Sequence, residues 1–382
     1  MIRQIRRINI SFTIKPVRGM STTPGKLSKK ELAKLPSPDG ELPELREWRE
    51  RFNQRPAPKP TLHNLRTARE LVKGFGIADS KSPKVIIEVF AGPGTLSRAL
   101  CELPPSKMSK LIILEHNPTY LPYLEVLAKL DKRVIVRPLN GWLWSSYSEI
   151  MKEGLLDDIM VQEWDNSIRG VHPPHPNLHF VATTIPFGET GEALFNQMFR
   201  AVAGHEWLFK YGPMPWSAVL PYSSWKRAVA PLESNQRCKL TCMVEATVEP
   251  ELVVDVEMME DHATHFFPPY KKINDHMVAA NFRPLGFQVM RVAGIPEWDY
   301  VLRSLWINKT TPIKKSLKHI SAGARNMVNY LDDSKVYILE KHPKNLTLDE
   351  WGILMKAFND WPFHPTDLGT LSDSIKLTDK RL

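Results

Sequence analysis

One short stretch of the sequence combines an apolar strand, a glycine turn and the start of a helix. Residues 85–90 read Val-Ile-Ile-Glu-Val-Phe, and Gly92 and Gly94 precede a helix that we expect from Thr95. Glycine adopts backbone angles closed to other residues, and without a Cβ it lets a ligand approach the main chain. The free N–H groups of the helix then point at that ligand. The pattern predicts a nucleotide or nucleoside site, although such a turn alone is weak evidence.

An acidic residue, Glu115, follows the glycine turn at the spacing found in nucleoside-binding proteins. Glu115 ends a second apolar run, 111–114. In nucleoside-binding α/β proteins, an acid about twenty residues beyond the glycine turn accepts hydrogen bonds from the two ribose hydroxyls. A carboxylate at a strand end is more often only solvated. The combination with the glycine turn therefore favours ribose binding.

Strands and helices alternate around these residues, which predicts an α/β protein with a doubly wound, Rossmann-like sheet. After residue 292 the pattern becomes helical, so we expect one large domain at 61–292 and a small helical domain at 293–365. The expected strands are 85–90, 111–114, 133–136, 180–184, 217–221, 240–248 and 287–292. The expected helices are 41–51, 62–75, 95–103, 122–130, 193–209, 223–230, 298–306, 313–330 and 348–361.

Composition sets bounds on the function. The 382 residues are 42% hydrophobic and 24% charged, which is ordinary for a globular protein. No apolar run approaches the ~18 residues of a membrane span. The net charge of +9 favours a polyanionic partner. Three cysteines are too few for a disulfide scaffold, which is consistent with a reducing compartment.

The two ends of the chain differ from its middle. Residues 1–30 hold many arginines and lysines interleaved with isoleucines, and the first acid is Glu31. This pattern is typical of a mitochondrial presequence, and the alternative is a basic tail that contacts nucleic acid. Residues 31–60 are rich in proline and charge and are expected to form a linker, while the polar residues 366–382 are expected to form a mobile tail.

The loop after the fourth strand carries a resemblance to a known family. Thr184-Ile185-Pro186-Phe187 resembles the Asn-Leu/Ile-Pro-Tyr/Phe loop of the ribosomal RNA adenine dimethyltransferases, which share a Rossmann-like S-adenosylmethionine-dependent methyltransferase fold. The resemblance implies that Thr184 and Phe187 occupy the catalytic positions, with Pro186 as the rigid turn. It also implies that Gly92, Gly94, Glu115 and Asn140 occupy the cofactor-binding positions for S-adenosylmethionine.

Three positions depart from the family pattern. Phe90 stands where the family has the first glycine of its turn, and Thr184 stands where it has asparagine. Asn140 replaces the acid that holds the cofactor's adenine, and its neutral amide loses the charge-assisted hydrogen bond. The departures indicate that methyl transfer is weakened or lost, while binding of S-adenosylmethionine is left open.

The C-terminal third is similar to a fungal branch of this family, the mitochondrial transcription factors B. The similarity is carried by Trp298-Asp299-Tyr300-Val301, by 309–312 and by the Trp-Pro-Phe ending at 361–363. It implies an initiation factor in the mitochondrial matrix that works with the mitochondrial RNA polymerase, melts promoter DNA and holds the non-template single strand. The alternative is an active ribosomal RNA adenine N6-dimethyltransferase that acts on rRNA.

Single strands are held by cations along the backbone and by aromatic rings against the bases. The candidate nucleic-acid-binding residues are Lys210, Tyr211, Trp216, Trp225, Lys226, Arg227, Lys309, Lys314, Lys315 and Lys318. For any one lysine a solvated helix face is the better interpretation. The tryptophans at 298, 306, 351 and 361 are expected in the small domain's core. His172, His175 and His179 lack accompanying acids or cysteines, so we expect no metal there.

Overall fold

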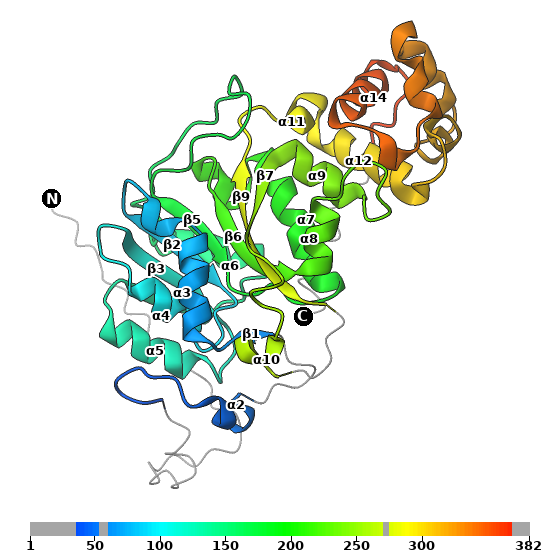
Figure 1. Cartoon of the computed structure of the whole chain (residues 1–382). Helices are drawn as coiled ribbons and strands as arrows, with labels where there is room; N and C mark the ends of the chain where they lie inside the picture. The colour runs from blue at the N-terminus through cyan, green and yellow to red at the C-terminus, as the bar shows by residue number, and fades with distance from the viewer. Residues whose placement is uncertain (1–35, 53–59, 270–274, 369–382) are drawn as a thin grey trace, which may run out of the picture. The chain divides into compact units, whose positions relative to one another are not determined.

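The computed structural model describes residues 36–52, 60–269 and 275–368, and these belong to one compact unit (Figure 1). The predicted presequence and nearly all of the predicted tail lie outside the described residues. No helix of the described segments is long and apolar enough to cross a membrane.

The centre of the unit is a seven-stranded sheet of order β4-β3-β2-β5-β6-β9-β7 (Figure 1). The first five strands in this order run parallel, and β9 pairs antiparallel with both β6 and β7. The strands are β2 (Lys84–Val89), β3 (Met108–Leu114), β4 (Val134–Arg137), β5 (Leu178–Ala182), β6 (Trp216–Pro221), β7 (Val248–Val254) and β9 (Met277–Pro284). The predicted Rossmann-like sheet is confirmed.

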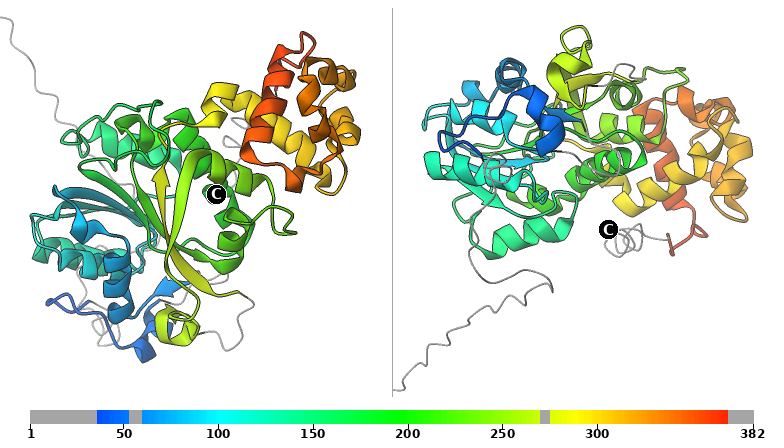
Figure 2. Two further views of the ribbon diagram at one scale, coloured as in Figure 1. Left: turned by 45° about the horizontal axis from the view of Figure 1, so that its top comes forward. Right: turned by 90° about the horizontal axis from the view of Figure 1, so that it is seen from below.

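Helices cover both faces of the sheet (Figure 2). Because side chains alternate along a strand, Ile86 packs into one core cluster while Val85 and Ile87 pack into the other. The first cluster includes α3 (Leu65–Gly74), α4 (Thr95–Cys101) and α5 (Leu121–Leu130). The second includes α6 (Trp144–Lys152), α7 (Glu189–Gly204) and α9 (Lys239–Thr247).

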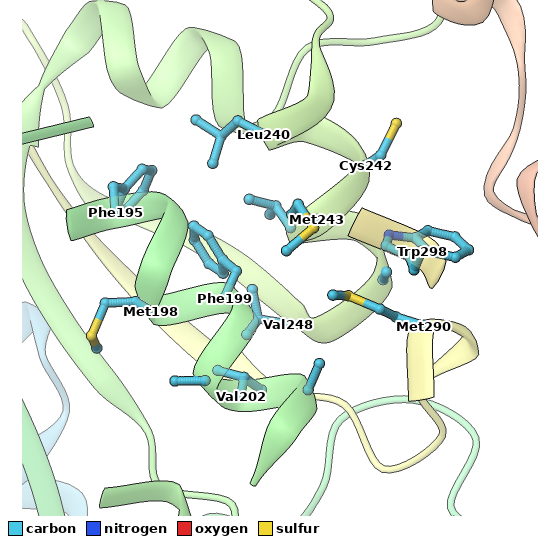
Figure 3. Close-up of a cluster of buried hydrophobic side chains, with 14 of the residues drawn as sticks. Phe195, Met198, Phe199, Val202, Leu240, Cys242, Met243, Val248, Met290 and Trp298 are labelled. Atoms are coloured by element: carbon cyan, nitrogen blue, oxygen red, sulfur yellow. The ribbon is translucent and has the colours of Figure 1, made fainter. Parts of the chain in front are cut away.

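The second core cluster continues into the C-terminal helices. Figure 3 shows Phe199 of α7, Met243 of α9, Met290 of α11 (Val289–Ala293) and Trp298 of α12 (Ile295–Leu305) converging. The cluster extends to α14 (Leu348–Asp360). Three of the four tryptophans expected in the small domain's core, at 298, 351 and 361, are buried. The domain boundary near residue 293 stays a prediction, since the hydrophobic packing is continuous across it.

Two strand predictions were wrong. Residues 240–248 form helix α9, and 287–292 fall mostly in helix α11; the last strands are β7 and β9. Helix α9 is buried on nearly every side, threonines included, so its sequence lacks the clear apolar and polar faces that would distinguish a helix from a buried strand. The expected long helix at 313–330 is divided into α13 (Ile313–Ser316), η4 (Leu317–His319) and η5 (Ala324–Tyr330).

The described part of the predicted linker packs on the fold. It contains α2 (Leu45–Arg51), from which Trp48 is buried, and Phe52 follows. Both rings join Tyr120 and Tyr123 in a small aromatic cluster beside α5. Residues 36–52 are therefore part of the compact unit rather than a free connection. A two-stranded sheet of β1 (Thr61–Leu62) and β8 (Phe266–Phe267) lies next to this cluster.

Candidate functional site

The carboxyl edge of the sheet brings the predicted cofactor and target-base positions together. Strand β2 lies between β3 and β5, and β4 pairs with β3. The turn at 90–94, Glu115, Asn140 and the loop at 183–187 therefore all follow adjacent parallel strands. In open α/β sheets, ligands bind at this edge, where the strand order reverses.

The glycines of the turn are required by the protein's own packing. Gly92 and Gly94 have φ of 60° and 91°, in the left-handed region. A Cβ on Gly92 would lie 2.5 Å from Thr61 Cγ2, and one on Gly94 would lie 2.6 Å from Leu124 Cδ2. The Arg98 guanidinium donates to the Pro93 and Gly94 carbonyls, at 2.8 Å each. Packing alone therefore accounts for both glycines without a bound ligand.

Glu115 lies at the end of β3 with its carboxylate directed at backbone N–H groups. One oxygen accepts from Gly92 N at 3.1 Å, and the other accepts from His116 N and Asn117 N at 2.9 Å each. Glu115 is 6% exposed. The carboxylate that was predicted to hold a ribose therefore ties the glycine turn to the loop after β3.

Phe90 and Trp142 form a ring pair beside the turn. Phe90 has φ of 59°, an uncommon conformation for a residue with a side chain, and its ring centroid lies 5.0 Å from that of Trp142. Asn140 Oδ1 accepts from the Trp142 N–H at 3.0 Å. The amide oxygen that was predicted to accept from a cofactor's adenine therefore fixes the loop that carries Trp142.

Glu88 is a central residue of the edge that sequence reasoning missed. Its carboxylate is fully buried and accepts from Ser97 Oγ at 2.7 Å and from Thr183 Oγ1 at 2.6 Å. Burial raises the pKa of Glu88 to about 7, while the two hydroxyls act against this rise. Glu88 thereby joins β2, α4 and the loop after β5. An acid inside an otherwise apolar strand was the available signal.

The predicted target-base loop is tightly enclosed. Thr184 and Pro186 are buried, and Phe187 is half-buried against the α3–α4–α5 cluster. A Cβ on Gly191 would lie 2.0 Å from the Pro186 carbonyl oxygen, so the first turn of α7 packs directly on the loop. The Ile185 N–H donates to Val219 O on the adjacent strand.

Taken together, the side-chain oxygens that the resemblance assigns to S-adenosylmethionine already accept hydrogen bonds from the protein's own backbone. Glu115 accepts from the glycine turn and from the loop after β3, and Asn140 accepts from the backbone N–H of Trp142 in its own loop. Phe90 brings a ring to the place of the family's first glycine. The edge keeps the architecture of a nucleoside site and uses its polar groups to stabilise its own loops.

The predicted nucleic-acid-binding residues separate into several places. Tyr211 O accepts from His175 Nε2 at the amino edge of the sheet, so Lys210 and Tyr211 lie opposite the candidate cofactor edge. Lys226 and Arg227 lie on α8 (Tyr222–Ala228), which follows the carboxyl end of β6.

The cations and rings of this group differ in their exposure. Lys226 is exposed, with Nζ 4.8 Å from the Tyr222 ring centroid, and Arg227 pairs with Glu192 of α7. Trp225 is 8% exposed, and Trp216 stacks on Phe282 in the core at 4.1 Å. The expectation that these two rings receive bases is corrected, because neither presents a free face.

The C-terminal cations lie on the surface. Lys314, Lys315 and Lys318 are exposed on α13 and η4, and Lys314 Nζ lies 3.5 Å from Glu340. Lys309 Nζ donates to Asn235 O at 2.7 Å, in the loop between α8 and α9. The loop that follows α8 is therefore in direct contact with Lys309 of the C-terminal segment.

The three histidines of the 172–179 segment are buried and have separate partners. His175 Nε2 bonds to Met160 O and Tyr211 O, and His179 Nε2 bonds to Ser217 Oγ. Burial lowers the pKa of His179 to about 3. Within the described ranges, no group of histidines, cysteines or acids could hold a metal ion.

Comparison with known proteins gives a family and a fold. The sequence model of the family described as "Ribosomal RNA adenine dimethylase" matches residues 62–356, more than half of the chain. The solved structure of a dimethyladenosine transferase from Plasmodium falciparum superposes with a TM-score of 0.51 at 14% identity, over 78% of this chain and 97% of that one. At that identity the likeness concerns the fold alone.

Two relatives carry different names. Mitochondrial transcription factor 1 of Saccharomyces paradoxus is 25% identical over 231 residues, 58% of this chain and 65% of the relative. The matched part is thus less than two thirds of the relative's length. Dimethyladenosine transferase 1, mitochondrial, of Vermamoeba vermiformis is 21% identical over 308 residues, 74% of this chain and 84% of the relative.

Proposed function

Because this chain belongs to the ribosomal RNA adenine dimethylase family, we propose that it is a member that acts in mitochondrial transcription initiation rather than in methyl transfer. The observation that carries the proposal is the internal bonding of the carboxyl edge, where Asn140 Oδ1 holds the loop of Trp142 and Trp142 packs on Phe90. A relative named mitochondrial transcription factor 1 supports the same function.

The proposed partners are promoter DNA and the mitochondrial RNA polymerase in the matrix. The exposed cations of α8 and of α13–η4 supply backbone attraction, which depends on salt and not on base sequence. The buried network of Glu88, Ser97 and Thr183 holds together β2, α4 and the loop after β5 at the carboxyl edge of the sheet. In this proposal the chain binds DNA without a methyl-transfer step.

Run-off transcription tests the proposal. A linear template with a mitochondrial promoter is transcribed by the mitochondrial RNA polymerase with and without the full chain. We expect specific transcripts to depend on the chain. The proposal fails if the polymerase alone initiates equally well on that template.

The second candidate function is adenine dimethylation of small-subunit rRNA. The features that favour it are the retained Gly92, Gly94, Glu115 and Phe187, together with the relative named dimethyladenosine transferase 1. Incubation with labelled S-adenosylmethionine and an unmodified small-subunit rRNA hairpin separates the two functions. Efficient formation of dimethyladenosine would overturn the non-catalytic assignment.

A further inference from the structure

Two lysines from the C-terminal segment converge on one residue of the loop between α8 and α9, residues 229–238. Lys309 Nζ donates to Asn235 O at 2.7 Å, and Lys344 Nζ donates to Asn235 Oδ1 at 3.3 Å. Lys309 follows η3 (Trp306–Asn308), and Lys344 lies in η7 (Pro343–Asn345). Two lysines, each more than 70 positions from Asn235 in sequence, thus bring positive charge to this exposed, neutral residue, one at its main-chain carbonyl and the other at its side-chain amide.

The acids of this neighbourhood have other partners. Glu245 pairs with Arg237, and Asp299 pairs with Lys239. Glu350 pairs with Lys341. Among the described residues, no acid forms an ion pair with Lys309 or Lys344, and the loop's own acid, Glu233, is exposed.

The loop is held firmly against the C-terminal segment. The buried Arg237 guanidinium, 1% exposed, binds both oxygens of Glu245 and donates to Leu346 O at 3.2 Å. The Glu233 N–H donates to Lys344 O at 3.1 Å, and Glu233 has φ of 69°. The main chain around Lys344 is therefore tied to this loop by contacts that do not involve the side chain of Asn235.

We propose that Lys309 and Lys344, with Asn235, form a binding site for a backbone phosphate of single-stranded nucleic acid. Each ammonium has three donors and gives one to Asn235, so donors remain for phosphate oxygens. A phosphate also neutralises the repulsion between the two cations. The loop follows α8, which carries Lys226, and Lys309 precedes Lys314, Lys315 and Lys318 in the sequence. This inference rests on the proposed function and assigns part of its DNA path to the C-terminal helices.

Fluorescence anisotropy of a labelled single-stranded oligodeoxynucleotide tests the site with the full chain. The double variant Lys309→Gln/Lys344→Gln should bind about tenfold more weakly at low salt. The slope of log affinity against log salt should fall by about 0.7 for each phosphate that the variant no longer neutralises. Lys129→Gln is the matched control, because this exposed lysine lies on α5 beside β4, at the other end of the sheet.

Further variants separate charge from folding. Lys309→Arg/Lys344→Arg keeps both charges and should restore most of the affinity, and Glu233→Gln should strengthen binding by removing the nearby acid. Thermal unfolding of each variant reports on the fold. The site is rejected if the double glutamine variant keeps wild-type affinity and salt slope, or if only duplex DNA responds to it. Parallel titrations with single-stranded RNA show which nucleic acid is preferred.

The outcomes of this experiment and of the transcription assay are distinguishable. If the wild-type chain supports promoter-dependent transcription while the double glutamine variant binds like wild type, the site is wrong and the function stands. The opposite result is a wild-type chain that fails to support transcription, together with a double glutamine variant that binds the oligodeoxynucleotide more weakly and with a smaller salt dependence. In that case the phosphate site stands and the proposed function fails.

Discussion

The glycine turn and the loop between α8 and α9 use charge in opposite ways. At the turn, the carboxylate of Glu115 and the amide of Asn140 bond to backbone N–H groups of the same edge. At the loop, Lys309 and Lys344 meet a neutral residue and have no acid as partner within the described segments. The candidate cofactor edge is thus internally bonded, while Lys309 and Lys344 carry positive charge that no acid of the described segments pairs with.

The strongest change should come from the residue that anchors the loop between α8 and α9. Replacing Arg237 with alanine leaves Glu245 without its buried partner and the Leu346 carbonyl without its donor. Because the Glu245 side chain is 36% exposed and water can reach it, we expect a loss of folding free energy at the lower end of the range for buried pairs, about 3 kcal/mol. Urea unfolding measures this loss. Arg283→Gln is the control, because Arg283 pairs with Glu249 on an exposed surface and should change stability by less than about 1 kcal/mol.

The second effect concerns the buried acid beneath the glycine turn. The pKa of Glu88 is about 7 in the folded protein against 4.5 as the ordinary value, so the folded protein binds this proton more tightly. Stability should therefore fall by about 3 kcal/mol as pH rises from about 4.5 to 7. In Glu88→Gln this contribution disappears.

The measurement is urea unfolding of both proteins at pH 5 and pH 8, compared as a difference. The pKa of His179 is lowered to about 3, so this residue makes the folded protein less stable as pH falls below 6.5, opposite to the effect of Glu88. Because His179 is present in both proteins, its contribution cancels when the two pH dependences are subtracted. If the stability of both proteins changes equally with pH, the raised pKa of Glu88 is wrong.

The third effect concerns the binding of S-adenosylmethionine at the candidate cofactor edge. The double variant Phe90→Gly/Asn140→Asp restores the family's glycine and its acid, and the new carboxylate adds a charge-assisted hydrogen bond for an adenine amino group. We expect its S-adenosylmethionine affinity to rise at least about tenfold, or ~1.4 kcal/mol, over the wild type. Calorimetry measures both proteins. Strong binding by the wild type would show that the edge opens readily for the cofactor.

The weakest effect concerns the loop backbone. Glu233 has a left-handed backbone conformation, and its N–H donates to Lys344 O. Glycine adopts this conformation at no steric cost, so Glu233→Gly should stabilise the chain by up to about 1 kcal/mol. A thermal melt measures the change. Glu340→Gly is the comparison, since that residue does not have positive φ and glycine should destabilise it there.

Sequence reasoning succeeded where a local pattern determines the structure. The β-branched run before the glycine turn became β2, and Glu115 ends β3 at the same edge. It failed for α9, because burial on all sides removes the periodicity that marks a helix. The rings of Trp216 and Trp225 were assigned to bases because composition does not show which aromatic residues the sheet covers.

The missed residues share a different cause. Glu88, Arg237 and Lys344 have their roles through partners distant in sequence, such as Thr183 at 95 positions from Glu88 and Leu346 at 109 positions from Arg237. No local spacing encodes these interactions. The sequence therefore predicts the edge that carries the candidate site, while the bonding state of that edge requires the three-dimensional structure.

The hydrogen bond between Arg98 and the N-terminal segment limits how far the chain can be shortened from its N-terminus. Arg98 Nε donates to Gly40 O at 2.8 Å, while the same guanidinium holds the glycine turn. Trimming within residues 1–35 leaves this acceptor in place. Removal of residues up to 52 would take away the acceptor together with Trp48 and Phe52. A chain shortened beyond Gly40 should therefore be less stable than one that keeps residues 36–52.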